Sequence, residues 1–219
     1  AWAKIIEGAL GEPTAQRAAR VTVEVFERLA TAASARFIIP GDDEWPAGLA
    51  DLRHAESIQR RGGEPVGLWL RGTGHLAHLM ERSVAIVGSR AATAYGTGIA
   101  ADLAADLVDQ GVTVLSGGAF GIDVAAHRGA LAGGGPTVCV LANGVDVAYP
   151  PGNAPIFATL ANDQLLVSEL PPAAHPTRVR FLARNRLIAA MSRGTVVVEA
   201  ALRSGARNTA GWALACGRP

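Results

Sequence analysis

A strand–loop–helix pattern that occurs twice in succession constrains the fold of this chain more than any other feature. In the first copy, the apolar run Val84–Val87 breaks at Gly88-Ser89-Arg90, and a segment of helical periodicity follows from Tyr95 to Gln110. The second copy has the same order, with strand Val112–Leu115, loop Ser116-Gly117-Gly118 and helix Phe120–Leu131. Two strands joined by a helix form a βαβ unit with parallel strands and a right-handed crossover. The sequence therefore predicts an α/β fold.

The remaining elements extend this pattern. Strands are predicted at Thr137–Leu141, Leu165–Ser168 and Thr195–Glu199, and helices at Ala154–Asn162, from about Phe181 onward, and at Ser204–Ala215. Two shorter strands, Arg36–Pro40 and Val66–Leu70, are expected to flank the main sheet. We expect a mostly parallel, doubly wound sheet over residues 35–219, preceded by the end of a small helical domain at 1–34. The chain does not begin with Met and stops where such a sheet would accept another strand, so we expect a piece of a longer protein.

The glycine-containing loops after the first two strands indicate an anion-binding site. The carboxyl ends of parallel strands share one edge of the sheet, and glycines there let backbone N–H groups approach a phosphate closely. Gly88-Ser-Arg-Ala-Ala-Thr93 does not match the G-x-G-x-x-G pattern of dinucleotide sites, and Lys4 is the only lysine, so no Walker lysine is present. No nicotinamide or ATP cofactor is predicted. The alternative is that these glycines only turn the chain, but packing gives no reason for Arg90 at a strand end.

Basic residues are concentrated near the end of the chain. Residues 175–219 contain eight arginines and one acid, Glu199, which gives this segment a net charge of +7. The whole chain has a net charge of +1, so the remaining residues carry 1 − 7 = −6. The arginines are Arg178, Arg180, Arg184, Arg186, Arg193, Arg203, Arg207 and Arg218. A basic concentration on an otherwise acidic chain is typical of a protein that binds a polyanion. The alternative is a solvated basic face.

Other polar residues favour structural roles. Asp123 and His127 are four apart in a predicted helix and are expected to form a hydrogen-bonded pair beside the second glycine loop. No nucleophile or group of metal ligands accompanies them, so neither catalysis nor a metal site is predicted. Asp146 follows Asn143-Gly144, where a turn role is favoured over that of a ribose ligand.

The cysteines and the hydropathy pattern indicate the cellular compartment in which the protein is expected. Cys139 and Cys216 lie in apolar surroundings without metal-ligand spacing, which indicates buried thiols in a reducing compartment, and we expect a cytoplasmic protein. No window of about 18 uninterrupted apolar residues is present, so a membrane span is not predicted.

Several motifs occur in a fixed order along residues 36–219. They are Gly88-Ser-Arg90, Ser116-Gly-Gly-Ala-Phe-Gly-Ile-Asp123 with His127, Asn143-Gly-Val-Asp146 with Tyr149-Pro150, Phe181-Leu-Ala-Arg-Asn-Arg-Leu-Ile-Ala189, and Ser204-Gly205 with Thr209-Ala210. In this order they resemble the DprA/Smf DNA-processing family. Two features depart from it: Arg207-Asn208 stands where the family usually has apolar residues, and no winged-helix tail is present.

The resemblance implies an extended Rossmann-like domain that binds single-stranded DNA independently of sequence and without hydrolysing it. It further implies a homodimer that protects incoming DNA and helps load the recombinase RecA in natural transformation and homologous recombination. The DNA-binding positions that it implies are Gly88, Ser89, Arg90, Ser116, Gly117, Gly118, Arg178, Arg180, Phe181, Arg184, Asn185 and Arg186. By the resemblance, Arg90 and Arg178 would hold phosphates, the Ser116–Gly118 amides would donate hydrogen bonds, and Phe181 would meet a base, while Asn185 and Arg186 belong to the same motif as Phe181. Arg184 and Arg186 diverge by about 200° on a helix, so they cannot share one ligand equally.

A basic groove with an aromatic platform is what sequence-tolerant binding of a single strand requires. Phe181 has an alternative role as a hydrophobic staple at the start of its helix. Two other functions remain open. A Rossmann-like nucleotide phosphoribohydrolase of the lysine-decarboxylase-like group would need Pro-Gly-Gly-x-Gly-Thr and a following Glu, whereas this chain has Ser116-Gly-Gly-Ala-Phe-Gly121 and only Glu199 as a comparable carboxylate. A pure protein-interaction module would show no salt-dependent affinity for DNA.

Overall fold

The computed structural model describes residues 22–55, 58, 62–201 and 204–219. Its strands are β1 (Arg36–Ile38), β2 (Leu68–Gly72), β3 (Ser83–Val87), β4 (Thr113–Ser116), β5 (Thr137–Leu141), β6 (Leu165–Ser168) and β7 (Gly194–Val197). They form one sheet in the order β1-β2-β6-β5-β4-β3-β7. Five neighbouring strands, β6, β5, β4, β3 and β7, are mutually parallel, while β2 is antiparallel to β6 and β1 is antiparallel to β2. The predicted mostly parallel sheet is confirmed.

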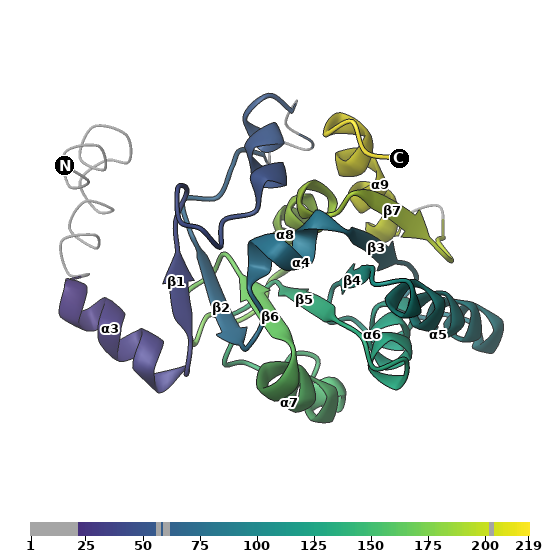
Figure 1. Ribbon diagram of the computed structural model, residues 1–219, viewed down its shortest axis with the longest axis horizontal. Coiled ribbons are helices and arrows are strands. Elements are labelled where there is room, and N and C mark those ends of the chain that lie inside the picture. The colour runs from purple at the N-terminus through teal and green to yellow at the C-terminus, as the bar shows by residue number, and fades with distance from the viewer. Residues whose placement is uncertain (1–21, 56–57, 59–61, 202–203) are drawn as a thin grey trace.

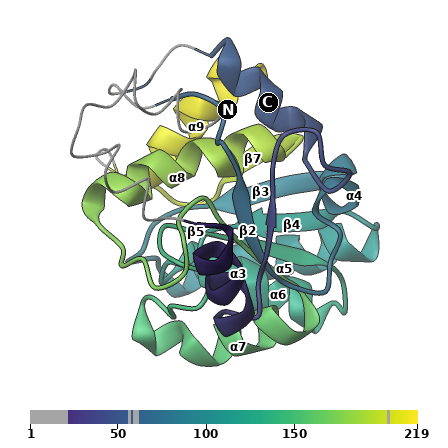
Figure 2. The same ribbon diagram turned by 90° about the vertical axis from the view of Figure 1, so that its left-hand side faces the viewer.

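Helices cover both faces of the sheet. They are α3 (Val23–Ala32), η1 (Ala47–Arg53), α4 (Leu76–Glu81), α5 (Ala94–Asp109), α6 (Ile122–Ala132), η2 (Pro151–Asn153), α7 (Ala154–Asp163), α8 (Arg178–Met191) and α9 (Gly205–Ala215). Helices α5, α6 and α7 lie against one face, and α8 and α9 lie against the other (Figures 1 and 2). This arrangement confirms the doubly wound α/β fold that the alternating pattern predicts.

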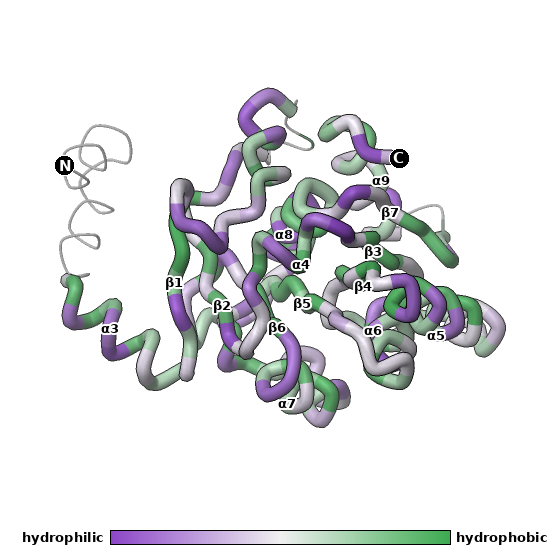
Figure 3. The backbone as a smooth tube through the Cα atoms, viewed as in Figure 1, coloured by the Kyte–Doolittle hydropathy of each residue, from purple (hydrophilic) through white to green (hydrophobic). Residues whose placement is uncertain are grey.

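The central strands β4, β5 and β6 bury both of their faces because they lie between these helical layers. Val138 and Val140 of β5 pack into the cluster that includes α8 and α9, whereas Cys139 and Leu141 pack into the cluster that includes α7. A parallel strand covered on both sides reads as a continuous apolar run, which is why these strands are readable in the sequence. In Figure 3 the tube of α5 alternates between hydrophilic and hydrophobic colours, as expected for a helix with one buried face.

The first described helix belongs to the same packed body as the sheet. Phe26 of α3 stacks on Trp69 of β2 with ring centroids 4.6 Å apart, and it meets Phe37 of β1 edge-on at 4.7 Å. The sequence predicts a helix that starts near Pro13 and runs through Val21, Val25 and Leu29. Val25 and Leu29 lie on α3, which begins at Val23 after the N-cap Thr22 and not near Pro13. Pro13 and Val21 lie outside the described part of the chain. The proposed domain boundary at residue 34 stays a prediction.

Element positions match the predictions more closely than element ends do. Helix α8 begins at Arg178, three residues before the predicted start, because Thr177 caps it: the Thr177 hydroxyl accepts a hydrogen bond from the Arg180 amide at 3.3 Å. Helix α4 was not predicted. The short strands β1 and β2 flank the sheet as expected, beside β6.

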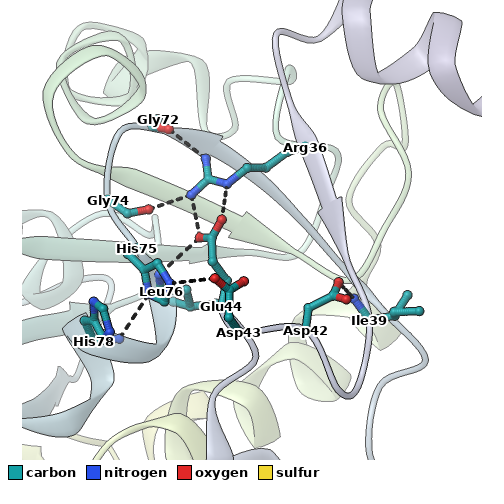
Figure 4. A network of polar contacts seen from close by, with 10 residues as sticks. All are labelled: Arg36, Ile39, Asp42, Asp43, Glu44, Gly72, Gly74, His75, Leu76 and His78. Atoms are coloured by element: carbon teal, nitrogen blue, oxygen red, sulfur yellow. Dashed lines mark hydrogen bonds and ion pairs between the residues drawn. The ribbon is translucent and has the colours of Figure 1, made fainter.

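A charged clamp holds β1 to the start of α4 (Figure 4). The Arg36 guanidinium donates two hydrogen bonds of 2.7 Å to Glu44, and it also donates to the carbonyls of Gly72 and Gly74. The Leu76 amide donates to the same Glu44 carboxylate at 3.3 Å, which places the carboxylate at the beginning of the helix. These contacts with Arg36 lower the pKa of Glu44.

Cys139 and Cys216 are both buried and unpaired, as predicted, and burial raises the pKa of each thiol. None of the helices in the described ranges combines the length and apolar character needed to cross a membrane.

Candidate nucleic-acid interface

A groove of about 1110 Å³ opens where the parallel strands end. Its walls come from the segments that follow β3, β4, β5 and β6 and from the first turns of α8 and α9. The charged side chains that line it are Arg90, Arg178, Arg184, Arg207 and Asp123. Doubly wound folds bind ligands at this edge of the sheet. Among the described residues, the wall carries four arginines and one carboxylate, which makes the groove suited to an anion.

Arg90, Phe181 and Tyr149 form a cluster inside this groove. The Arg90 guanidinium carbon lies 4.7 Å from the centre of the Phe181 ring, and the Tyr149 ring lies 5.9 Å from Phe181 at an angle of 44°. Tyr149 is 40% exposed, so its ring is available to a ligand. A cation over an aromatic face is an attractive contact that leaves the guanidinium N–H groups free for other acceptors. The structure thus brings Arg90 and Phe181 to the same place, as the basic groove expected from the sequence requires.

Arg90 and Arg178 form no ion pair with any residue that the structure describes. Arg178 lines the groove because Thr177 starts α8 directly before it. Arg180, two residues later, instead donates to the His175 carbonyl of the preceding loop and does not line the groove. Arg90 and Arg178, and not Arg180, are therefore placed to meet a ligand directly.

Arg184 lies under the groove and is only 7% exposed. One of its guanidinium nitrogens donates to the Val140 carbonyl at the end of β5. Burial lowers the pKa of Arg184, and the nearby Asp123 carboxylate opposes that effect. Burial likewise raises the pKa of Asp123, and Arg184 opposes it. Each of the two groups therefore favours the charged form of the other against the effect of burial.

The loop Ser116-Gly117-Gly118 faces inward. The Ser116 hydroxyl is fully buried and donates to the Ile86 carbonyl at 2.6 Å, and the Gly118 carbonyl accepts from Asn153 at 3.0 Å. A side chain on Gly117 would come within 2.1 Å of Arg184 and 2.5 Å of Asp123. The structure does not place these three residues on the groove wall, although Ala119, the next residue, lines it. Gly117 is therefore needed for close packing around Arg184, and Gly118 for close packing against Phe157.

The predicted pairing of Asp123 with His127 is wrong. The His127 ring bonds instead to the Gly117 carbonyl through Nε2 at 2.8 Å and to the Thr137 hydroxyl through Nδ1 at 2.7 Å. Asp123 accepts from the Ala119 amide at 3.4 Å. Both residues are buried, Asp123 in the first turn of α6 and His127 in its middle, and neighbouring loops and strands supply their partners. They hold the glycine loop, as a structural role requires.

Asn185 and Arg186 follow Arg184 on α8 and have separate functions. Asn185 lines the groove and donates to the Gly205 carbonyl and to Asn208, each at 3.2 Å, so it ties α8 to α9. Arg186 forms an ion pair of 2.6 Å with Glu169 and donates to the Gly63 carbonyl, away from the groove. The predicted divergence of Arg184 and Arg186 is confirmed.

Asp146 has the structural role that the sequence favours for it. Its carboxylate accepts from the Ala173 amide at 2.8 and 3.0 Å, where Ala173 has a positive φ of 64°. This contact, with the bond from the Gly144 amide to the Ala174 carbonyl at 2.9 Å, fixes the proline-rich loop that leads to Thr177 and the groove.

Comparison with known proteins identifies the family. Residues 36–219 match the family model described as DNA recombination-mediator protein A. The chain belongs to this family. It is 52% identical over 185 residues to a protein of Mycobacterium tuberculosis strain H37Rv named putative DNA processing protein DprA, which covers 84% of this chain and 48% of that protein. It is 38% identical over 177 residues to DNA processing protein DprA of Streptococcus pneumoniae, covering 81% of this chain and 58% of that one.

Solved structures of the DNA recombination-mediator protein A family have the same fold. The X-ray structure of DprA from Streptococcus pneumoniae matches with a TM-score of 0.82 at 31% identity, covering 100% of this chain and 73% of that one. DNA processing protein A of Helicobacter pylori, whose structure describes a single-stranded DNA binding mode, matches with a TM-score of 0.72 at 28% identity, covering 85% and 80%. The chain spans about half the length of the curated relatives that it matches.

Tyr149, Arg207 and Asn208 line the groove but were not among the predicted site positions. Tyr149 belongs to a motif quoted for the resemblance, but its Tyr-Pro context reads as a turn. Arg207 and Asn208 replace residues that are usually apolar, which left the packing of α9 open. The structure places both on the groove wall, which they share with the buried Ala206 and Thr209 of the same helix. The presence of polar residues at two positions expected to be apolar was the sequence signal that could have identified Arg207 and Asn208 as groove residues.

Proposed function

We propose that this domain binds single-stranded DNA independently of sequence. The observation that carries the proposal is the groove in which Arg90 and Arg178 have no ion-pair partner among the described residues and lie beside the Phe181 and Tyr149 rings. Arginines hold phosphates of any sequence, and aromatic rings accept any base because every base has a π-face. A duplex keeps its bases stacked inside, so only a single strand can supply both groups at once.

We propose a contact set that follows which of the predicted positions line the groove. Gly88, Ser89, Arg90, Arg178, Phe181 and Asn185 line the groove and are proposed to meet DNA, with Tyr149 added. Arg184 is proposed to act through its charge from beneath the floor. Ser116, Gly117, Gly118, Arg180 and Arg186 are proposed to hold the walls, because each makes a contact within the protein and does not line the groove.

The wider cellular roles also belong to this proposal. The family description names a recombination mediator, and one solved relative is described with a single-stranded DNA binding mode. Protection of incoming DNA, loading of RecA, homodimer formation, a cytoplasmic location and the lack of enzymatic activity are expected here on that basis. They concern the whole protein, of which this chain covers a part of the length of its relatives.

Fluorescence anisotropy with a labelled oligonucleotide tests the proposal. We expect the wild-type protein to bind a single strand more tightly than the matched duplex, and Arg90→Ala and Arg178→Ala to weaken binding across sequences. Arg128→Ala is the control, because Arg128 is an exposed arginine of α6 outside the groove. Equal affinities of wild type and both groove variants would remove these residues from the site.

The phosphoribohydrolase alternative loses support from the position of Glu199. Its carboxylate accepts hydrogen bonds from the amide and hydroxyl of Thr93, each at 3.0 Å, and Glu199 does not line the groove. A catalytic carboxylate would have to face the ligand. Incubation with AMP should therefore release no adenine; turnover would overturn the proposed function.

A further inference from the structure

Glu199 stands two residues beyond β7 and contacts the loop that carries Arg90. Strands β3 and β7 are parallel neighbours, with Val87 opposite Val197, so the chain leaves both strands at the same edge. The Ser89 amide donates to the Glu199 main-chain carbonyl at 2.6 Å. Gly88 permits this approach, because a side chain there would come within 2.9 Å of the same carbonyl and 2.4 Å of Ile122.

The Glu199 carboxylate holds the other end of the same loop. One oxygen, Oε2, accepts from both the amide and the hydroxyl of Thr93, and the Thr93 hydroxyl in turn accepts from the Gly96 amide at 3.0 Å. Thr93 is the N-cap of α5, so the carboxylate lies where a helix attracts anions. A side chain on Gly96 would come within 2.2 Å of that oxygen, so the glycine admits the carboxylate to the first turn. Glu199 thus takes the place that a phosphate occupies in many doubly wound folds.

The loop is also held from the side of α6. The Ile122 amide donates to the Ser89 carbonyl at 3.2 Å. Gly121 has a φ of +77°, and a side chain on it would come within 2.7 Å of the Arg90 carbonyl. The backbone of the loop is therefore fixed between Glu199 and α6, while the Arg90 side chain extends over Phe181 in the groove.

We propose that Glu199 is a positioning residue for DNA binding: by bonding to Thr93 and Ser89 it fixes the 88–93 loop so that Arg90 faces the groove. This inference rests on the proposed function. Glu199 touches no DNA in this scheme and acts only through Arg90. A loop released from Glu199 would let Arg90 sample many directions, and the binding free energy would then include the cost of ordering it.

A double-mutant cycle with single-stranded DNA tests this role. Glu199→Ala removes the carboxylate bonds to Thr93 but keeps the main-chain bond to Ser89, so it should weaken binding by up to the effect of Arg90→Ala, which is roughly 10-fold if Arg90 holds one phosphate. Arg90→Ala/Glu199→Ala should bind no more weakly than Arg90→Ala alone. Glu199→Gln should restore binding, because its amide oxygen still accepts from Thr93. Asp102→Asn, which removes a charge from the exposed face of the same helix, is the control and should bind as the wild type does.

Backbone hydrogen exchange supplies a readout that does not depend on DNA. The Thr93 amide should exchange faster in Glu199→Ala and slowly again in Glu199→Gln. If Glu199→Ala does not fold, Glu199→Asp is tested in its place, because it keeps the charge on a side chain that is one methylene shorter. Its DNA binding should be weaker and its Thr93 amide should exchange faster than in the wild type. The inference is overturned if the Thr93 exchange rate is unchanged, or if the wild type binds DNA through Arg90 while the Glu199 and Arg90 effects add fully. Absence of wild-type binding alone would instead refute the proposed function.

Discussion

His127 shows how a single buried side chain sets the shape of the loop under the groove. It is 1% exposed, and both ring nitrogens are bonded, to the Gly117 carbonyl and to Thr137. Burial lowers the pKa of His127 to about 4, with the Arg184 charge acting in the same direction and the bond to Gly117 opposing them. The ring is therefore neutral at physiological pH, although an exposed histidine would be partly protonated in mild acid.

This burial predicts a pH dependence of stability. The unfolded chain protonates His127 near its ordinary pKa of 6.5, whereas the folded protein does so only near 4. Between these values the unfolded state binds more protons, so the free energy of unfolding should fall as pH decreases through this window, by about 3 kcal/mol in total. Urea unfolding across the window should show this loss, and His127→Gln should remove it.

The raised pKa of Asp123 opposes this trend, because the folded state then binds the extra proton. The contribution of His127 is therefore the difference between wild type and His127→Gln at each pH. Parallel profiles for the two proteins would contradict the assignment of a neutral, buried imidazole.

The two groove aromatics supply a second prediction for single residues. Phe181→Ala and Tyr149→Ala should each weaken single-strand binding by about 1–3 kcal/mol if each ring stacks on a base. An oligonucleotide that contains 2-aminopurine reports stacking directly, because its fluorescence is quenched on an aromatic ring. Phe120→Ala is the matched control, since Phe120 is 49% exposed but lies in a different depression between α5 and α6. Unchanged quenching in both groove variants would show that the rings only support the walls.

Only part of the site was predictable at the level of residues. Helical spacing alone shows that Arg184 and Arg186 point apart. Their tertiary contacts decide which of the two arginines lies near the groove. Arg186 bonds to Glu169 and Gly63, away from the groove. Arg184 bonds to Val140 and lies near Asp123. These partners come from other strands and loops, so local spacing contains no information about them.

At the scale of elements, charged clamps fix strands that have little core of their own. Strand β1 has three residues at the sheet edge, and Arg36 ties it to Glu44 and to the turn after β2 (Figure 4). The carboxylate is only 17% exposed, so loss of either partner leaves a partly buried charge without compensation.

We predict that Glu44→Ala lowers the free energy of unfolding by about 1–3 kcal/mol, because it removes charge-assisted hydrogen bonds to Arg36 and the anion at the start of α4. Asp43→Ala is the control: its side chain is 91% exposed, and it should change stability little. Thermal unfolding of the two variants makes the comparison. Equal melting temperatures would show that the clamp is only a surface ion pair.

The order of the strands and helices was predictable because buried parallel strands and amphipathic helices have distinct periods. Helix α4 was missed because it has six residues and a histidine N-cap, which is not a typical capping residue. The start of α8 was placed too late because Thr177 follows a proline and reads as loop. Ends of elements are set by individual hydrogen bonds, and periodicity does not contain these.

At the scale of the whole molecule, the net charge is close to zero, but positive charge is concentrated at the groove. The total is +1, yet Arg90 and Arg178, which form no ion pair within the described ranges, line one groove at one end of the sheet. A field focused in a groove attracts a polyanion even when the molecule as a whole is close to neutral.

This arrangement predicts a steep dependence of single-strand binding on salt. The slope of log K against log salt concentration should become shallower by about 0.7 for each phosphate that is no longer neutralised, as in Arg90→Ala or Arg178→Ala. Titrations at several salt concentrations measure the slope, and Arg128→Ala should leave it unchanged. A slope that neither groove variant alters would place the phosphates on another face.

The contact between Arg90 and the Phe181 ring has one more consequence. The aromatic face is covered by the Arg90 guanidinium, and this is the group proposed to hold a phosphate. An incoming nucleotide must displace the guanidinium from the ring before its base can stack there, and it offers the freed cation a new anionic partner. Binding at this position therefore replaces the contact between Arg90 and Phe181 with contacts to the nucleotide. The measured affinity reports the difference in free energy between these two sets of contacts.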